Sequence, residues 1–255
     1  MSRLDARSIV VTRPERQAGA LARLIEDAGG RALRYPAIEI EASGSPALDA
    51  IVATLESFDV AIFISRNAVE EGLARVRALR PWPAGLAVAA VGAGTRRALE
   101  AQGMTGVVAP EGPADSEALL ERPLLKSATG RRIVIFRGEG GRELLASTLR
   151  ARGATVDYAE CYRRVRPATD VRPLIAEWTR GGVDAVTVSS GEALANFAAL
   201  LGSEGRDLLA ATALFVPHAR VGDEARLLGL GSVQVAGPAD EEMLAALVAY
   251  FGRAG

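Results

Sequence analysis

The chain has 255 residues, of which 49% are hydrophobic and 24% are charged, and its formal net charge is −1. This length suits two domains of average size, and the composition is typical of a globular protein. The near-neutral charge argues against a general nucleic-acid-binding function, and no apolar run is long enough to span a membrane. Cys161 is the single cysteine, which excludes an intrachain disulfide and a cysteine-based zinc site.

The first half of the chain alternates short apolar runs with helix-like segments. No signal-peptide core precedes the first run, which predicts a cytoplasmic protein. Strands are predicted at 8–12, 31–35, 60–64 and 86–91. Helices are predicted from Ala18 to Ala28, from Ala68 onwards, and between Thr95 and Gly103. This order indicates a parallel sheet with helices on both faces.

The second half of the chain repeats the first at an offset of about 124 residues, the separation between Val11 and Ile135. The matched segments are Val11–Pro14 with Ile135–Gly138, Phe63–Ser65 with Thr187–Ser189, and Gly112–Glu117 with Gly237–Glu242. A period of this length is too long for a solenoid, so it predicts a duplicated α/β domain.

The residues that follow the predicted strands are small, hydroxylic or cationic. In open parallel sheets, ligands bind beyond the carboxyl ends of the strands, and helix N-termini there favour anions. These segments are Thr12–Pro14, Ser65–Asn67, Gly92–Thr95, Arg137–Gly141, Ser189–Gly191 and Pro217–Arg220. Two such rims facing each other would form a cleft for a ligand with many carboxylates. Nucleotide binding is not indicated, because Arg97 stands where G-x-G-x-x-G needs its last glycine.

Two extended segments, Tyr35–Glu41 and Tyr158–Pro167, occupy the same place in the two halves. We expect them to lie side by side as a linker between two domains, with Tyr162 pointing into the cleft. The alternative for Tyr162 is packing on an edge strand, where aromatic residues are common.

A set of motifs runs through almost the whole chain in a fixed order: Val11–Pro14, Gly29–Pro36, Phe63–Val69, Ala90–Thr95, Cys161–Arg164, Val188–Gly191 and Val216–Arg220. Their order and spacing resemble the uroporphyrinogen-III synthase family. The resemblance implies two similar flavodoxin-like α/β domains with parallel sheets, joined by a two-stranded linker, the first domain being discontinuous. The implied bounds are 1–36 with 167–255 for the first domain, 42–158 for the second, and 37–41 and 159–166 for the linker.

The resemblance also implies an activity, that of a cyclising lyase in heme and tetrapyrrole biosynthesis with no metal or organic cofactor. The enzyme would close hydroxymethylbilane to uroporphyrinogen III, with loss of water and inversion of ring D. The substrate also closes unaided to the type I isomer, so the protein's task would be largely conformational. The implied protein is a cytoplasmic monomer without nucleic-acid or membrane partners, supplied by hydroxymethylbilane synthase.

Tyr162 matches the family's linker tyrosine, which is thought to help the hydroxyl leave. A phenol can donate a hydrogen bond to a departing hydroxide. The residues expected to bind substrate are Arg13, Ser65, Asn67, Thr95, Arg137, Gly138, Ser189, Ser190, Gly191 and Arg220.

Several of these residues also have a purely structural interpretation. Ser65 and Ser189 each stand between a strand and a helix, so we expect both to act as helix N-caps. Thr95 suits capping and carboxylate binding equally. Arg13 and Arg137 are repeat-related cations that either remain solvated or meet the ligand.

Two other classes of function remain open. A non-catalytic cytoplasmic binding protein could close its two domains on a small polyanionic ligand, and turnover of hydroxymethylbilane would separate it from a synthase. A scaffold of the response-regulator type would need acidic residues at a strand end, where this chain carries Ser, Gly and Arg.

Overall fold

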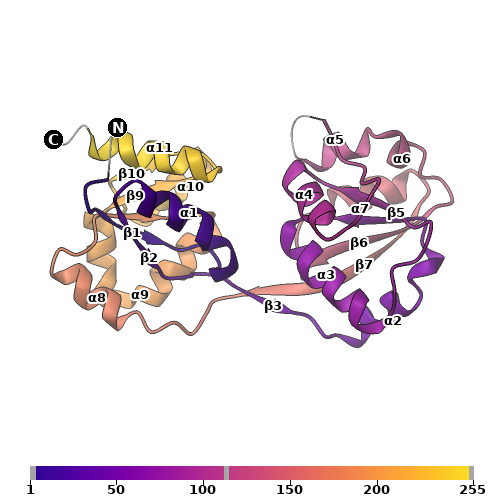
Figure 1. The fold of residues 1–255 in the computed structure, drawn as a ribbon, viewed down its shortest axis with the longest axis horizontal. Helices are drawn as coiled ribbons and strands as arrows, with labels where there is room; N and C mark the ends of the chain where they lie inside the picture. Colours follow the sequence, from indigo (N-terminus) through magenta and orange to yellow (C-terminus); the bar gives the residue numbers. More distant parts are fainter. Residues whose placement is uncertain (1–3, 112–114, 253–255) are drawn as a thin grey trace. The chain divides into compact units, whose positions relative to one another are not determined.

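The computed structural model describes residues 4–111 and 115–252. The chain folds into two compact units. Unit 1 comprises Met1–Glu39 and Val165–Gly255, and unit 2 comprises Ile40–Arg164. Each unit is built around a five-stranded sheet that is flanked by helices (Figure 1).

The sheet of unit 1 has the order β10-β9-β8-β1-β2, and its strand pairs are parallel. Its strands are β1 (Ser8–Val11), β2 (Arg31–Arg34), β8 (Ala185–Thr187), β9 (Ala213–Val216) and β10 (Val233–Val235). The fully buried β1 lies between β2 and β8. Unit 1 therefore joins the beginning of the chain to its last third within one sheet.

The helices of unit 1 are α1 (Glu15–Asp27), α8 (Arg172–Thr179), α9 (Gly191–Ala211), α10 (Ala219–Leu227) and α11 (Asp240–Phe251). Leu21 of α1 and Leu247 of α11 are buried in one cluster with Ile9 and Phe215 of the sheet. Because side chains alternate along a strand, Val216 next to Phe215 points to the opposite face, where it lies near Gly222 of α10. The sheet is thus covered on both faces, as its unbroken apolar strands require.

The sheet of unit 2 has the order β3-β7-β6-β4-β5. Its strands are β3 (Glu39–Ala42), β4 (Val60–Phe63), β5 (Ala87–Ala90), β6 (Arg132–Gly138) and β7 (Thr155–Val165). The pairs β4–β5, β4–β6 and β6–β7 are parallel. Alternation along β4 sends Ala61 and Phe63 into one hydrophobic cluster and Val60 and Ile62 into another.

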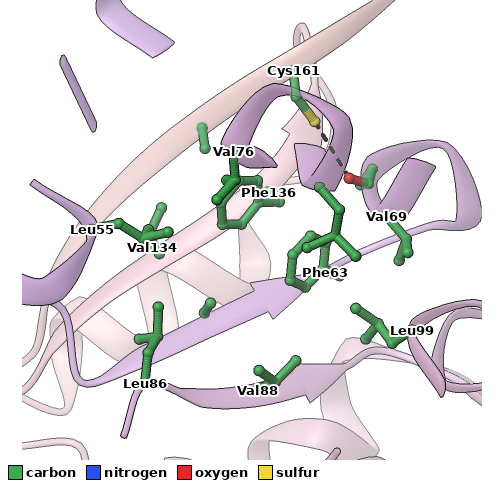
Figure 2. Close-up of a cluster of buried hydrophobic side chains, with 14 of the residues drawn as sticks. Leu55, Phe63, Val69, Val76, Leu86, Val88, Leu99, Val134, Phe136 and Cys161 are labelled. Atoms are coloured by element: carbon green, nitrogen blue, oxygen red, sulfur yellow. Dashed lines mark hydrogen bonds between the residues drawn. The ribbon is translucent and has the colours of Figure 1, made fainter. Parts of the chain in front are cut away.

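The helices of unit 2 divide between these two faces. The helices α2 (Pro46–Ala53), α3 (Arg66–Leu79) and α4 (Ala93–Ala101), with the 3-10 turn Leu55–Ser57, supply the Phe63 cluster. The helices α5 (Ser116–Leu120), α6 (Pro123–Lys126) and α7 (Leu144–Ala151) supply the Ile62 cluster. Figure 2 shows Phe63 and Phe136 at the centre of the first cluster, where their rings stack with centroids 4.5 Å apart.

The internal repeat is present in the strand order. The offset relates β6 to β1, β7 to β2, β4 to β8, and β5 to β9. Replacing each strand of β7-β6-β4-β5 by its counterpart gives β2-β1-β8-β9, which is the order in unit 1. The place of β10 is taken in unit 2 by Val108, which forms a parallel bridge with Ala89 of β5. Of the repeated segments, Gly112–Ala114 lies outside the described residues.

The segment predicted as the second linker strand, 159–166, lies almost wholly in a strand. Most of it belongs to β7, which runs unbroken from Thr155 to Val165 and pairs with β6 as far as Tyr162. β3 lies beside β7 at the edge of the same sheet, and the Ser43 amide donates to the Cys161 carbonyl at 2.9 Å. The strands β3 and β7 therefore lie side by side, whereas the role of 159–166 as a linker stays a prediction.

The fold class is the predicted one: two parallel α/β sheets, each with helices on its faces. Counted along its own strands, unit 1 has the order 2-1-3-4-5 of flavodoxin-like sheets. Two helices begin earlier than predicted, α1 at Glu15 rather than Ala18 and α3 at Arg66 rather than Ala68. Within the described ranges, none of the helices has the length and apolar character needed to cross a membrane.

Candidate functional site

Three of the predicted site residues meet at the carboxyl end of the sheet in unit 2. Ser65 follows β4, Gly138 ends the neighbouring β6, and Tyr162 of β7 is paired with Gly138. The hydroxyl groups of Ser65 and Tyr162 share a hydrogen bond of 3.1 Å. The parallel order thus brings together residues almost a hundred positions apart in the chain.

Ser65 is the N-cap of α3, as predicted. Its backbone is extended, and its Oγ accepts a hydrogen bond of 3.1 Å from the Ala68 amide. Such a bond satisfies one of the amides that a helix leaves unpaired in its first turn. Ser65 therefore holds the helix start and the phenol of Tyr162 with the same oxygen.

Tyr162 is largely buried within unit 2, and its contact with a substrate stays a prediction. Its side chain is 3% exposed and belongs to the cluster that contains Phe63 and Phe136. The cause is a bulge: Arg137 is paired with Glu160 and Gly138 with Tyr162, so Cys161 is the extra residue on β7. The bulge breaks the alternation and turns both Cys161 and Tyr162 towards the same cluster.

Gly138 lies directly under the ring of Tyr162. A Cβ atom at this position would stand 2.7 Å from both Cε2 and Cζ of the tyrosine, closer than such atoms can approach. The glycine was predicted as a substrate contact from its place at a strand end. The structure gives it a definite task, which is to leave room for the Tyr162 ring.

Arg137 is buried rather than solvated, with 2% of its surface exposed. Its Nε donates to the Gly138 carbonyl at 3.3 Å, its Nη1 forms an ion pair of 3.0 Å with Glu143, and its Nη2 donates to the Gly140 carbonyl. The guanidinium also lies over the Tyr158 ring, 4.5 Å from the centroid. Arg137 therefore fixes the loop that follows β6.

Glu143 and Tyr158 complete this arrangement and were not found from the sequence. The Tyr158 hydroxyl donates to Glu143 at 2.5 Å. This hydrogen bond, assisted by Arg137, lowers the pKa of Glu143, whereas burial and the nearby carboxylate raise the pKa of Tyr158. Glu143 thus stays ionised and Tyr158 protonated at neutral pH. An exposed Glu in a Gly-rich loop carries no sequence signal for such a role.

The two remaining candidates in unit 2 lie at helix starts. Thr95 is the third residue of α4 and is 8% exposed, whereas the N-cap of α4 is Gly92. Asn67 is the second residue of α3, is partly buried and has an interaction partner within the protein. Thr95 is therefore not a cap, and substrate contact by either residue stays a prediction.

In unit 1, Ser190 and not Ser189 is the N-cap of α9. The Ser190 hydroxyl accepts a hydrogen bond of 3.1 Å from the Ala193 amide. The predicted cap at Ser189 is therefore wrong by one residue. The offset of the repeat had placed Ser189 opposite Ser65, and two adjacent serines left the sequence unable to separate them.

The first residue of α9, Gly191, lies against the carboxylate of Glu224. A Cβ atom on Gly191 would overlap the Glu224 Oε2 atom, so the glycine permits this close approach. Glu224 also pairs with the largely exposed Arg220 at 3.1 Å. An anionic group thus already occupies the start of α9, the kind of position that favours anions.

Arg13, the repeat counterpart of Arg137, also has partners within its unit. It forms an ion pair with Asp240 at the start of α11 and donates to the Pro238 carbonyl at 3.4 Å. Its side chain is 18% exposed. Arg13 and Arg220 are therefore both paired with a carboxylate of the protein, but Arg13 is largely buried whereas Arg220 is largely exposed.

Cys161 is placed for packing rather than for chemistry. It is 1% exposed, its thiol lies 3.3 Å from the Arg137 carbonyl and 3.7 Å from the Ala68 carbonyl, and burial raises its pKa to about 12. Figure 2 shows Cys161 with one hydrogen bond from its thiol. Because the thiolate is the reactive form, we expect iodoacetamide not to modify the folded protein at mildly alkaline pH. Mass spectrometry should find complete modification in concentrated guanidinium chloride. Rapid labelling of the folded protein would contradict this burial.

Metal binding finds no support in the described parts of the chain, 4–111 and 115–252. There, no group of three or more His, Cys, Asp or Glu side chains is placed to hold a metal ion.

The fold and the strand-end residues define a class: a two-unit parallel α/β protein whose strand ends carry hydroxyl groups and cations suited to an anionic ligand. Residues 19–246 match the family model described as "Uroporphyrinogen-III synthase HemD". The chain belongs to the uroporphyrinogen-III synthase family.

Relatives with this name are similar over almost their full length. The chain is 36% identical over 240 residues to the uroporphyrinogen-III synthase of Salmonella typhimurium and 33% identical over 240 residues to that of Escherichia coli. Each alignment covers 93% of this chain and 98% of the relative.

Solved structures support the fold. A uroporphyrinogen-III synthetase from Helicobacter pylori matches with a TM-score of 0.64 at 12% identity, covering 96% of this chain and 99% of the other. A mutant uroporphyrinogen III synthase from Thermus thermophilus matches with a TM-score of 0.58 at 22% identity, covering 98% of each chain.

Proposed function

We propose that this chain is a uroporphyrinogen-III synthase, a cyclising lyase that converts hydroxymethylbilane into uroporphyrinogen III with loss of water and inversion of ring D. Membership of the family supports this activity. The observation that carries the chemistry is the hydrogen-bonded pair Tyr162 and Ser65 at the carboxyl end of a parallel sheet, where ligands of such sheets bind.

The direction of the hydrogen bonds suits Tyr162 to act as a donor. Ser65 Oγ already accepts from the Ala68 amide, and a serine hydroxyl has a single proton to give. When Ser65 donates that proton to the Tyr162 oxygen, the phenol proton is left for another acceptor. The positive end of the α3 dipole then polarises this series of hydrogen bonds, so the phenol becomes a better donor to the ligand.

In the reaction, the hydroxymethyl carbon of the substrate loses its hydroxyl group. The Tyr162 phenol donates a hydrogen bond to this oxygen as the C–O bond breaks. The pyrrole nitrogen of the same ring loses its proton, so hydroxide leaves as water and a neutral azafulvene remains. Ring D then attacks through its substituted carbon and forms the spirocyclic pyrrolenine. Opening of the spirocyclic ring and its reclosure give the product with ring D inverted. The protein must therefore hold ring D so that its substituted carbon attacks the azafulvene.

The carboxylates of the substrate need cations and amides at the strand ends. Arg220 is the predicted cation most open to a ligand, with 79% of its side chain exposed. Binding through the starts of α3 and α9 would use Asn67, Ser189, Ser190 and Gly191, with Glu224 moving away from Gly191. Arg13 and Arg137 act through their loops, because both are largely buried as well as paired with carboxylates of the protein, whereas Arg220 pairs with Glu224 on an open surface. A cytoplasmic monomer that receives substrate from hydroxymethylbilane synthase remains part of this proposal.

Turnover of hydroxymethylbilane distinguishes the proposed synthase from a binding protein without catalytic activity. Hydroxymethylbilane should disappear far faster with the purified protein than in buffer, and catalytic amounts of protein should suffice. Disappearance at the buffer rate would contradict the synthase. It would leave a protein that binds a polyanion without transforming it.

Ser65→Ala tests the support that Ser65 gives to Tyr162. Loss of the N-cap should lower stability by about 1 kcal/mol, and loss of the donor to Tyr162 should lower kcat about tenfold. Ser65→Thr should recover most of both. Ser45, which caps α2 through the Leu48 amide at 3.2 Å, offers the control: Ser45→Ala should lose similar stability and keep the wild-type kcat. Equal kcat values for the two alanine variants would contradict a role for Ser65 beyond capping.

A further inference from the structure

Unit 2 contains a cavity of about 280 Å³ on the face of the sheet opposite to Tyr162. Its lining includes the apolar residues Ile64, Ile135 and Leu145 and the arginines Arg137, Arg142 and Arg164. Ile135 and Leu145 belong to the Ile62 cluster, whereas Tyr162 belongs to the Phe63 cluster across the sheet. The cavity is therefore separate from the Tyr162 and Ser65 pair.

The lining of this cavity is positive. Three arginines and, among the described residues, no Asp or Glu form its wall. Glu143, just outside the lining, pairs with Arg137 at 3.0 Å, so it offsets one of the three charges. Arg142 and Arg164 are both exposed, and Arg164 also has an interaction within the protein. The wall itself therefore offers cations to a ligand and presents no carboxylate that would repel an anion.

The loop that carries Arg142 is held in place by the buried Arg137. Gly140 and Gly141 have positive φ angles of 70° and 110°, a region that favours glycine. A Cβ atom on Gly141 would stand 2.8 Å from the Arg137 Nη2 atom. The fold therefore holds the backbone next to Arg142 in place, while the Arg142 side chain itself is exposed at the cavity.

The repeat-related part of unit 1 lacks this group of cations. A smaller cavity of about 180 Å³ is lined there by Arg13, which pairs with an acidic residue at the start of α11. The repeat offset places Ala18 and Ile40 opposite Arg142 and Arg164. Of these two cavities, the cavity of unit 2 therefore combines an apolar lining with several arginines.

We propose that the cavity of unit 2 binds a flat apolar ring that carries a carboxylate, with the ring on Ile64, Ile135 and Leu145 and the carboxylate on Arg142 and Arg164. Arginine suits this task because its planar fork binds both carboxylate oxygens. The site deepens the proposed function and rests on it, because each pyrrole ring of hydroxymethylbilane carries acetate and propionate groups. The cavity would then hold one ring of the tetrapyrrole.

The test uses pyrrole-2-carboxylate as the probe and pyrrole-2-carboxamide as its neutral counterpart. The isotope-labelled full chain is titrated with each probe, and the amide chemical shifts are recorded by NMR. Pyrrole-2-carboxylate should shift the amide signals of Ile64, Ile135 and Leu145. The carboxamide should bind at least about tenfold more weakly, since charge-assisted hydrogen bonds are lost. Shifts confined to other regions, or equal affinity for both probes, would overturn the proposal.

The variant Arg142→Gln/Arg164→Gln should weaken probe binding at least about tenfold. Arg163→Gln is the matched control, because Arg163 is the exposed neighbour of Arg164 on β7 and pairs instead with Glu41 at 2.7 Å. It should leave probe binding unchanged. Both altered side chains of the double variant are exposed, so the fold should survive, as thermal unfolding can verify.

The same variants separate failure of this site from failure of the proposed function. The double variant should raise KM for hydroxymethylbilane at least about tenfold, whereas Arg163→Gln should not. A wild-type KM in the double variant, with type III product still formed, would overturn the cavity proposal and leave the synthase standing. Probe binding at the cavity in a protein that forms no type III product would instead contradict the synthase.

Discussion

Replacing Tyr162 by Phe should lower kcat for uroporphyrinogen III on the order of 10²-fold, the size of effect that a positioned proton donor contributes. The loss should be incomplete, because the protein would still bind and fold the substrate for attack by ring D. The proportion of type I product should rise, since the azafulvene then has more time to close without guidance. Product analysis by chromatography after oxidation measures both effects.

The stability of Tyr162→Phe should change little by comparison. The variant keeps the buried ring and loses only the 3.1 Å hydrogen bond to Ser65, which is worth about 1 kcal/mol. Tyr250→Phe removes a phenol hydroxyl from α11 in unit 1 and should keep the wild-type kcat. If Tyr162→Phe also kept the wild-type rate and product ratio, Tyr162 would be a packing residue only.

Gly138→Ala should impair both stability and activity, because the added methyl group would overlap the Tyr162 ring at 2.7 Å. Overpacking of this kind costs about 1–3 kcal/mol of unfolding free energy. The ring must also move away from Ser65, so kcat should fall at least as far as in Tyr162→Phe. Gly44→Ala is the control, since a Cβ atom there meets nothing within 4 Å.

A double-mutant cycle can show that the effect passes through Tyr162. In a Tyr162→Ala background the alanine at 138 has no ring to displace, so Gly138→Ala should cost almost nothing in unfolding free energy. The coupling energy should then equal most of the single-variant loss. Additive losses, with the same cost in both backgrounds, would mean that Gly138 is required for another reason, such as the bulge itself.

Much of the fold follows from local patterns in the sequence. The apolar runs at β1, β4 and β6 are buried on both faces of a parallel sheet and therefore lack polar alternation, which makes them easy to recognise. The cap at Ser65 is also readable, because a serine between such a run and a helix has few other uses. Because the two halves of the chain are repeats, strands recognised in one half predict strands at the matching positions of the other.

The position of Tyr162 was not predictable from the same patterns. Strict alternation would place Cys161 and Tyr162 on opposite faces of β7, but the bulge opposite Arg137 and Gly138 turns both into one cluster. A bulge depends on the backbone of two strands at once. A single sequence shows only the glycine that makes room for it.

The environment of Arg137 was hidden for a different reason. An arginine at a strand end is usually solvated, and its burial here depends on Glu143, on the Gly140 carbonyl and on the Tyr158 ring. These partners come from a loop and from a neighbouring strand. These partners meet only in the tertiary structure. The cavity beside Arg142 could not be predicted from the sequence either, because it depends on the conformation of the same loop.

The isomer composition of the product tests the central claim most directly. Hydroxymethylbilane is incubated with the purified wild-type protein, the product is oxidised, and type I and type III porphyrins are separated, with a protein-free sample in parallel. The account predicts that type III dominates with the protein and type I without it. Type I alone in both samples would contradict the synthase and leave a family member that keeps the fold without the activity.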